Sequence, residues 1–228
     1  AMTAREPMTV AGLAVALWAF RSVDESLEIS AVVVDGQRSA PGDRLAVIEG
    51  SARAILAAER TALNLAQHLC GIATATAAFA QRIAGTGCIL LDTRKTTPGL
   101  RSLEKEAVRA GGGSNHRMGL HDGILLKDNH VAACGGIVAA VAAARRNRPH
   151  GLLIQVEVDR LDQIEPALEA GAERLLCDNM TCDELRAAVA LVKGRVPIEA
   201  SGGITLETVA AVAATGVDYI STSKINQG

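Results

Sequence analysis

The stretch ERLLCDNMTCDELRAAVALVKGRVPIEASGG, residues 173–203, decides the expected fold. It contains two short apolar runs, Arg174–Cys177 and Pro197–Glu199, which we interpret as strands. Between them, residues 182–193 are rich in alanine, and their apolar side chains recur at helical spacing. Thr181 precedes two acids, as expected at the start of a helix. A strand, a helix and a second strand in this order predict a βαβ unit with parallel strands.

The same alternation extends over most of the chain from about residue 85 onward. Further strands are predicted at Cys88–Leu91, Ile124–Leu126, Ile154–Val158 and Tyr219–Ser221, with helices at 137–146, 161–170 and 205–215. Gly171 and Gly216 fit the ends of two of these helices, and Thr205 fits the start of the last one. Strands that return at intervals of about twenty residues indicate repeated βα units.

Each predicted strand ends in polar residues, and their distribution favours a particular kind of parallel sheet. The polar ends are Asp92 with Arg94 and Lys95, Lys127-Asp128-Asn129, Glu157 with Asp159, Asp178-Asn179, Ser201-Gly202-Gly203 and Ser221-Thr222-Ser223. In a parallel α/β barrel the carboxyl ends of all strands converge on the face that carries the active site. An open doubly wound sheet would concentrate its ligand groups near one or two strands. Six polar ends therefore predict a barrel.

The first sixty residues follow another pattern. The sequence predicts a segment at Met8–Phe20 that leads into a helix, and strand-forming residues are frequent at Leu27–Val34 and Leu45–Ile48. A turn is predicted at residues 40–43. An amphipathic helix is predicted at Ser51–Leu69, and Ser51 could cap it. We therefore predict a small α+β lobe at 1–60, followed without a low-complexity linker by a barrel domain at 61–228.

Composition excludes several classes of protein. The net charge of −2 and the presence of only four aromatic residues argue against nucleic acid as a partner, because such binding needs a basic face or stacking rings. No apolar run reaches the roughly 18 residues of a membrane span. The five cysteines are scattered, without a Cys-x-x-Cys pair, which predicts reduced thiols in a cytoplasmic protein.

Positive charge is nevertheless concentrated in one segment of this slightly acidic chain. Between Arg94 and His130 lie seven Lys or Arg residues, four acids and three of the five histidines. Arg94-Lys95 follows a strand and precedes a Pro-Gly turn, which suits a carboxylate or phosphate clamp as well as a solvated basic loop. Lys127 closes a strand and could bind an anion or form a Schiff base. The segment predicts a small, highly anionic ligand.

Glycine-rich and acidic groups complete the candidate chemistry. The glycines at 111–113 could let the backbone approach a phosphate just before two cationic groups, His116-Arg117, or could simply end a helix. Glu157 and Asp178 end neighbouring strands and could bind Mg²⁺, act as acid and base, or balance nearby cations. Ser201-Gly202-Gly203, before the next helix, could seat a phosphate.

Taken in order, these motifs resemble one family over nearly the whole chain. The matching segments are Glu59-Arg60-Thr61 with Leu63-Asn64, Gly71-Ile72-Ala73-Thr74, Asp92–Arg101, Gly111–Arg117, Lys127–His130, Glu157-Val158-Asp159, Asp178-Asn179 and Ser201-Gly202-Gly203. They are similar to quinolinate phosphoribosyltransferase, also called nicotinate-nucleotide pyrophosphorylase (carboxylating).

The resemblance implies a fold and a reaction. The fold is a type II phosphoribosyltransferase architecture, in which a small α+β open-sandwich lobe precedes an incomplete, seven-stranded α/β barrel in a homodimer. The reaction moves the phosphoribosyl group of 5-phosphoribosyl 1-diphosphate to quinolinate, releasing carbon dioxide and pyrophosphate and forming nicotinate mononucleotide for de novo NAD biosynthesis. Mg²⁺ is the implied cofactor.

The resemblance also implies roles for individual residues. The acceptor would be bound by Thr93, Arg94, Lys95, His116, Arg117 and Lys127, with Arg60 entering from the partner subunit. The ribose and Mg²⁺ would be held by Glu157 and Asp178. The 5-phosphate would be bound by Ser201, Gly202, Gly203, Ser221, Thr222 and Ser223. Among these, Lys95, Lys127, Glu157 and Asp178 are the expected catalytic residues. Relatives of this kind begin a few dozen residues earlier and continue past the last strand, and residues 223–228 depart from their pattern.

Three alternatives stay open on the sequence alone. The first is a related pyrophosphorylase-like protein associated with molybdenum transport, which acts on another acceptor. The second is a Schiff-base aldolase that uses Lys127. The third is a nucleotide sensor without catalysis, against which the presence of both Glu157 and Asp178 argues.

Overall fold

The computed structural model describes residues 1–227, which divide into two compact units. Unit 1 comprises residues 1–80, 95–114 and 225–227, and unit 2 comprises residues 81–94 and 115–224. The sequence-based boundary between residues 60 and 61 stays a prediction, and helix α2 (Ala52–Arg82) runs across it. No helix among the described residues combines the length and the apolar character needed to traverse a lipid bilayer.

Unit 2 is built on a parallel sheet of six strands. The strands are β6 (Ile89–Leu91), β7 (Ile124–Leu126), β8 (Ile154–Val158), β9 (Arg174–Asp178), β10 (Ile198–Ser201) and β11 (Tyr219–Ser221), in the order β6-β11-β10-β9-β8-β7. Because β6 and β7 are its two edges, the sheet is an incomplete barrel. The seventh strand implied by the resemblance is not among the elements of the described chain.

The predicted strands are confirmed to within about two residues at their ends. The reason is the near-continuous apolar character that a strand covered on both faces requires. In β9, for example, Leu175, Leu176 and Cys177 are at most 5% exposed. In β8 the apolar Ile154, Val156 and Val158 alternate with Gln155 and Glu157 and are at most 1% exposed.

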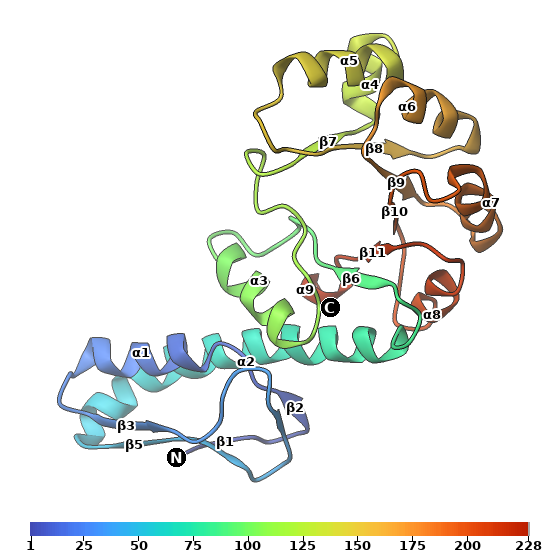
Figure 1. The fold of residues 1–228 in the computed structure, drawn as a ribbon. Coiled ribbons are helices and arrows are strands. Elements are labelled where there is room, and N and C mark those ends of the chain that lie inside the picture. The colour runs from blue at the N-terminus through green and yellow to red at the C-terminus, as the bar shows by residue number, and fades with distance from the viewer. Residues whose placement is uncertain (228) are drawn as a thin grey trace. The chain divides into compact units, whose positions relative to one another are not determined.

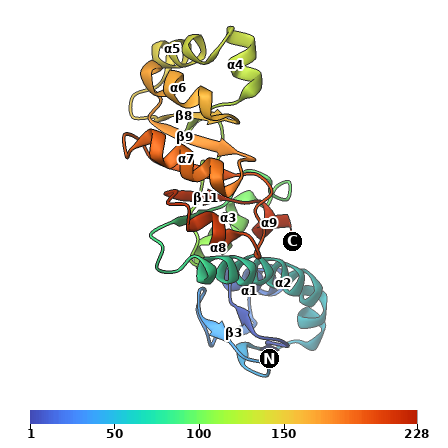
Figure 2. The same ribbon diagram turned by 90° about the vertical axis from the view of Figure 1, so that its right-hand side faces the viewer.

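Helices cover the outer side of this sheet (Figures 1 and 2). They are α4 (Asp128–Cys134), α5 (Ile137–Asn147), the 3-10 turn η1 (Leu161–Gln163), α6 (Ile164–Ala170), α7 (Cys182–Val192) and α8 (Val209–Ala213). The predicted start of α7 is confirmed, because the Thr181 hydroxyl accepts a hydrogen bond from the N–H of Glu184 and the Glu184 carboxylate accepts one from the N–H of Thr181. Gly171 ends α6 with φ of 97°.

One helix of unit 2 begins later than expected, and another helix was not expected. Helix α8 begins at Val209 and not near Thr205, because residues 206–208 form a turn in which the Thr208 N–H donates to the Thr205 carbonyl. Helix α4 was not predicted. It follows β7 directly, and the imidazole Nδ1 of His130 accepts the Lys127 N–H at 2.9 Å at its start.

Unit 1 combines small sheets with helices. Strands β1 (Met2–Thr3), β5 (Arg44–Glu49) and β3 (Glu28–Ala31) form one antiparallel sheet, and β2 (Met8–Thr9) pairs with β4 (Arg38–Ser39). The helices are α1 (Leu13–Val23), most of α2, α3 (Arg101–Ala110) and the described part of α9 (Lys224–Gln227) that lies in unit 1. The predicted helix from Ser51 is confirmed, although it continues thirteen residues beyond Leu69.

Small side chains on α2 set the packing of unit 1. Ala54, Ala58, Ala62 and Ala66 recur every fourth residue and are all buried in its core. Residues four apart lie on the same face of a helix, so this alanine stripe lets other elements approach the α2 backbone closely. The approach is tight at Gly111, where an added Cβ would lie 2.4 Å from the carbonyl oxygen of Ala73.

Candidate active site

The strand register brings the predicted acidic and hydroxyl side chains of unit 2 to one rim of the sheet. Glu157 of β8 pairs with Leu176 of β9, and Ser201 of β10 pairs with Asp178 of β9. A pocket of about 120 Å³ on this rim is lined by Asp128, Val131, Ile137, Glu157, Asp159, Gln163 and Asp178. The predicted gathering of polar strand ends is therefore present, and its β8–β9 side is strongly acidic.

Lys127 faces this acidic part of the rim. Its ammonium nitrogen lies 2.8 Å from Oε2 of Glu157, and the lysine side chain is 46% exposed while the glutamate is 12% exposed. The carboxylate orients the end of a flexible lysine, and the exposed ammonium keeps further donors for an anionic ligand. This ion pair suits an anion contact better than a Schiff base, which requires a neutral amine.

Two arginines, Arg94 just after β6 and Arg117 just before β7, lie near each other in unit 2. Arg117 is half-buried and its Nη1 donates to the Gly123 carbonyl at 2.8 Å. Burial lowers the pKa of Arg117, and the positive charge of Arg94 lowers it further. Two guanidinium groups close enough to repel each other form a site whose electrostatic energy falls when a dianion binds.

Asp92 joins the end of β6 to the segment that carries His116. Its side chain is fully buried; Oδ1 accepts the N–H of His116 at 2.7 Å and Oδ2 accepts Nδ2 of Asn115 at 2.8 Å. Hydrogen bonds to a buried carboxylate are among the stronger ones in proteins. Asp92 thus ties residues 115–116 to the strand end before Thr93 and Arg94.

The Ser201-Gly202-Gly203 segment has a backbone that demands glycine. Gly202 and Gly203 have φ of 92° and 63°, and an added Cβ on Gly202 would lie 2.2 Å from Oδ1 and 2.8 Å from the backbone nitrogen of Asn179. The expectation that this segment opens the next helix was wrong, because α8 begins only at Val209. A phosphate seat here would be formed by the backbone of the loop itself and not by a helix N-terminus.

The neighbouring β11 loop is tied to the same region by hydroxyl groups. Ser221 Oγ donates to Ser201 Oγ at 3.1 Å, and Thr222 Oγ1 donates to the Ile204 carbonyl at 2.9 Å. The N–H of Thr222 donates to the Leu91 carbonyl at 3.3 Å. Ser221 and Thr222 are buried, whereas Ser223 is half-buried. A contact from the Thr222 hydroxyl to a phosphate would require it to leave Ile204.

Two of the predicted binding residues belong to unit 1. Arg60 is exposed on α2, and Lys95 is exposed at the start of the 95–114 segment. The roles assigned to them by the resemblance stay predictions.

Nowhere in residues 1–227 do three or more His, Cys, Asp or Glu side chains form a group that could hold a metal. Mg²⁺ in phosphate chemistry typically takes one or two carboxylates, several waters and the substrate's own phosphate oxygens. Glu157 and Asp178 fit that shared arrangement, since both are carboxylates that line the same pocket.

Sequence reasoning missed the supporting residues of this site. Asp92 was seen only as a polar strand end, and Gln155 and Glu199 were not considered. Gln155 Nε2 donates to Oε2 of Glu199 at 2.7 Å, and both side chains are buried. Their signal was present, because each stands two residues before a predicted site residue, Glu157 or Ser201, and therefore on the same face of its strand.

The chain combines an incomplete parallel α/β barrel with a small α+β unit that precedes most of it in the sequence. Cationic and acidic side chains lie on the carboxyl rim of the barrel. These features define the type II phosphoribosyltransferase class. Two family descriptions match the chain: "Quinolinate phosphoribosyl transferase, N-terminal domain" over residues 1–70 and "Quinolinate phosphoribosyl transferase, C-terminal domain" over residues 72–228. The chain belongs to the quinolinate phosphoribosyltransferase family.

Individual relatives agree with this assignment. A probable nicotinate-nucleotide pyrophosphorylase (carboxylating) of Bacillus subtilis is 46% identical, covering 92% of this chain and 73% of the relative. The protein of the same description from Synechocystis is 43% identical, covering 96% and 76%. Among solved structures, NadC from Streptococcus pyogenes is 41% identical with a TM-score of 0.94, covering 98% of this chain and 79% of that one.

Proposed function

We propose that this protein transfers the phosphoribosyl group of 5-phosphoribosyl 1-diphosphate to quinolinate with decarboxylation. The products are nicotinate mononucleotide, carbon dioxide and pyrophosphate, in de novo NAD biosynthesis. One observation carries the proposal: in a member of this family, a single unit holds two mutually repelling arginines and an acidic pocket on the same rim as the Lys127–Glu157 ion pair.

The first task of the residues is to bring two anions together. Quinolinate carries two carboxylates and the donor carries three phosphate groups in all, so the substrates repel each other in water. Arg94 and Arg117 supply forked donors that match carboxylates, and Lys127 supplies a point charge. Lys95 and His116 are the further acceptor contacts that we carry over from the family resemblance, with Thr93 as a hydroxyl donor. Compensating charge and fixed orientation are the largest contributions such a site can make.

The second task is to stabilise the ribose as its bond to pyrophosphate breaks. The anomeric carbon then gains positive charge, which nearby carboxylates stabilise electrostatically. This role is supported by the position of Glu157 and Asp178 on adjacent strands and in the lining of one pocket, and both carboxylates would also accept hydrogen bonds from the ribose hydroxyls. Lys127, bound to Glu157, links the acceptor part of the site to the ribose part.

Glu157 and Asp178 are also the residues that would hold Mg²⁺ together with the diphosphate. Bound there, Mg²⁺ supplies positive charge that favours departure of the diphosphate. The 5-phosphate would occupy the loop of Ser201, Gly202 and Gly203, whose positive φ angles leave backbone amides available, with residues 221–223 beside it.

Decarboxylation follows from the product of transfer. Once its nitrogen is ribosylated, the ring is cationic, and the positive nitrogen stabilises the electron pair that stays on the neighbouring ring carbon when the carboxylate departs as carbon dioxide. The carbon then takes a proton. The residues need to hold the ring in place and exclude competing reactions during this step.

We further propose a cytoplasmic homodimer in which Arg60 of each subunit completes the acceptor site of its partner. The free state of all five cysteines supports a reducing compartment. The shared site rests on the family resemblance and has a direct test. Arg60→Ala and Lys127→Ala proteins, each nearly inactive, should recover up to half the parental activity per dimer after subunit exchange, because one site in the mixed dimer carries neither change. A verified mixed dimer without recovered turnover would refute the shared site.

The reaction itself is tested with quinolinate, 5-phosphoribosyl 1-diphosphate and Mg²⁺. We expect nicotinate mononucleotide and carbon dioxide in equal amounts, and very poor turnover of nicotinate, which has one carboxylate. Arg94→Lys keeps the charge but removes the fork, so quinolinate binding should weaken by about 1.5–3 kcal/mol, the scale of a charge-assisted hydrogen bond. Comparable turnover of nicotinate and quinolinate would overturn the assignment, and borohydride trapping of Lys127 would favour an aldolase.

A further inference from the structure

We propose that Glu199 is a positioning residue for the acceptor site, acting through His116 on Arg117. The inference rests on the proposed function and extends it to a residue inside the barrel. Glu199 lies on β10 two residues before Ser201, and its side chain is fully buried. A carboxylate at such a depth is costly unless donors compensate for the lost water.

The donors of Glu199 come from three other segments of unit 2: β8 with Gln155, the segment that carries His116, and β11 with Ser221. Oε2 accepts Nε2 of Gln155 at 2.7 Å and lies 3.3 Å from Nε2 of His116. Burial alone would raise the pKa of Glu199, but its interactions with His116, followed by hydrogen bonds from Ser221 and Gln155, hold it below the ordinary value. The same negative charge, together with burial, raises the pKa of the nearby Cys177 thiol to about 12. Glu199 is therefore an anion inside the barrel.

The contacts of His116 determine which ring nitrogen carries the proton. Nδ1 accepts the N–H of Arg117 at 2.8 Å, so this nitrogen has a free lone pair. The proton must then reside on Nε2, which faces the Glu199 carboxylate. The backbone N–H of His116 is held separately by Asp92 at 2.7 Å. In this arrangement the His116 ring accepts a hydrogen bond at Nδ1 and presents Nε2 to the carboxylate of Glu199.

This tautomer has a consequence for Arg117. Only an unprotonated Nδ1 can accept the Arg117 N–H, and that bond fixes the backbone from which the guanidinium extends. The guanidinium in turn donates a hydrogen bond to the Gly123 carbonyl and is repelled by the positive charge of Arg94. Removing the acceptor at Glu199 frees the imidazole to rotate or change tautomer. The forked donors of Arg117 then lose their fixed position, and the affinity for quinolinate falls more than the affinity for the phosphoribosyl donor.

The second oxygen of Glu199 makes an informative substitution possible. Oε1 is buried and has no hydrogen-bond partner among residues 1–227. Glu199→Gln can therefore place its amide nitrogen at that position and keep its oxygen for Gln155 and His116. Glu199→Met has a similar volume but no acceptor. Gln155→Met is the matched control, because it removes the other bond to Oε2 and leaves the His116 contact in place.

The experiment combines steady-state kinetics with ¹⁵N NMR of the histidine ring, which distinguishes a protonated from an unprotonated nitrogen without requiring activity. We expect the parent to show an Nε2–H tautomer for His116. Glu199→Met should lose this tautomer and raise the quinolinate KM at least tenfold, with the KM for 5-phosphoribosyl 1-diphosphate within twofold. Glu199→Gln should retain the tautomer with a two- to fivefold rise in quinolinate KM, and Gln155→Met should retain the tautomer with a smaller rise in quinolinate KM than Glu199→Met.

Several outcomes would overturn the inference. An Nδ1–H tautomer in the parent would do so, as would a parental tautomer and quinolinate KM in Glu199→Met. Equal rises in both KM values would indicate a general structural role. If Glu199→Met does not fold, a parental quinolinate KM in Glu199→Gln would also refute it, since the charge is then irrelevant. Failure of the parent to use quinolinate would refute the proposed function instead, and the tautomer would still be measurable.

Discussion

Replacement of Glu104 should show how much a buried carboxylate stabilises unit 1. Glu104 lies in the first turn of α3 and is fully buried. Its Oε1 is 2.9 Å from Nε2 of His68 and accepts the Thr97 N–H at 3.1 Å, while Oε2 accepts Nδ2 of Asn226 at 3.0 Å. One side chain thus joins α2, the basic 95–100 segment and α9.

The expected cost depends on which donors lose their partner. Glu104→Ala removes all three acceptor contacts, each worth about 1.5–3 kcal/mol when the acceptor is charged. The His68 side chain is 34% exposed and Thr97 is exposed, so water can replace part of the loss. We therefore expect a decrease in the free energy of unfolding of about 3 kcal/mol, which is below the summed range of about 4.5–9 kcal/mol because water replaces part of the lost contacts.

Glu104→Gln should cost less, for a reason visible in the contacts. Its amide oxygen can keep His68 and Thr97, while its amide nitrogen would face Nδ2 of Asn226. Asn226 Oδ1 is buried without a hydrogen-bond partner in the described chain, so a flip of the Asn226 amide would restore a bond. The remaining loss is the charge assistance, about 1 kcal/mol.

The pH dependence provides an independent check. Burial raises the pKa of Glu104, but the bonds from Thr97, His68 and Asn226 together lower it below the ordinary value. A carboxylate with a lowered folded-state pKa stabilises the protein above its unfolded pKa of about 4.3, and this stabilisation is lost as the pH falls through the folded value. The difference between the parent and Glu104→Gln should therefore be full at pH 7 and shrink in acid.

Equilibrium unfolding in urea, followed by circular dichroism at several pH values, measures these differences. Glu106→Ala is the control on the same helix, because Glu106 is 65% exposed and pairs only with Arg109 on the surface. It should change stability by at most about 0.5 kcal/mol. A Glu104→Ala protein as stable as the control, or a Glu104→Gln difference that does not vary with pH, would refute the reasoning.

Three further predictions concern unit 2. Leu175→Ala empties a fully buried position and should cost about 2–5 kcal/mol in urea unfolding, against little change for the 54% exposed Leu153→Ala; equal effects would contradict the packing. Gly202→Ala should raise the KM for 5-phosphoribosyl 1-diphosphate about tenfold, because its Cβ meets the Asn179 backbone, and an unchanged value would remove this loop from the phosphate site. The exposed Cys134 should react with a thiol reagent at pH 8 well before Cys177, whose pKa is raised to about 12 by burial and then by Glu199; rapid labelling of Cys177 in the folded protein would contradict this.

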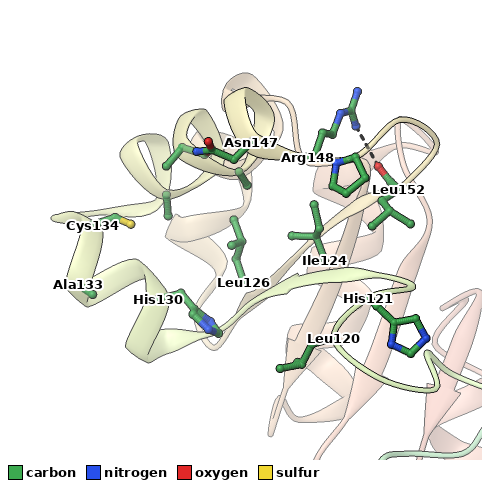
Figure 3. A pocket seen from close by; sticks show the side chains of 14 residues that line it. Leu120, His121, Ile124, Leu126, His130, Ala133, Cys134, Asn147, Arg148 and Leu152 are labelled. Carbon is green, nitrogen blue, oxygen red and sulfur yellow. Dashed lines mark hydrogen bonds between the residues drawn. The ribbon is translucent and has the colours of Figure 1, made fainter.

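A groove lies beside the edge strand β7. It has a volume of about 510 Å³ and is lined mainly by apolar groups between β7, α4 and α5, with His121 and His130 near its rim (Figure 3). His130 already accepts the Lys127 N–H, so its imidazole has a structural role at the start of α4. Nothing in the described residues indicates what would cover the groove.

The sequence by itself determined the strands of unit 2 and the chemical types at their ends. Runs such as residues 175–177 are apolar because both faces of a parallel sheet are covered, and this requirement acts locally along the chain. Residues after each strand, including Arg94, Lys127 and Asp178, were found for the same reason, since the carboxyl ends of parallel strands share a face. The family followed from the order of those motifs.

Only the tertiary structure decided which polar groups hold the others in place. Asp92 and His116 are 24 positions apart and Gln155 and Glu199 are 44 apart, so no local periodicity connects them. Packing likewise set the length of α2, for which the sequence pattern predicted an end at Leu69. The Thr205–Thr208 turn set the late start of α8, for which the pattern predicted a start near Thr205. Propensity and spacing act between neighbours in sequence, whereas the energy of a buried carboxylate depends on donors that folding alone brings within 3 Å.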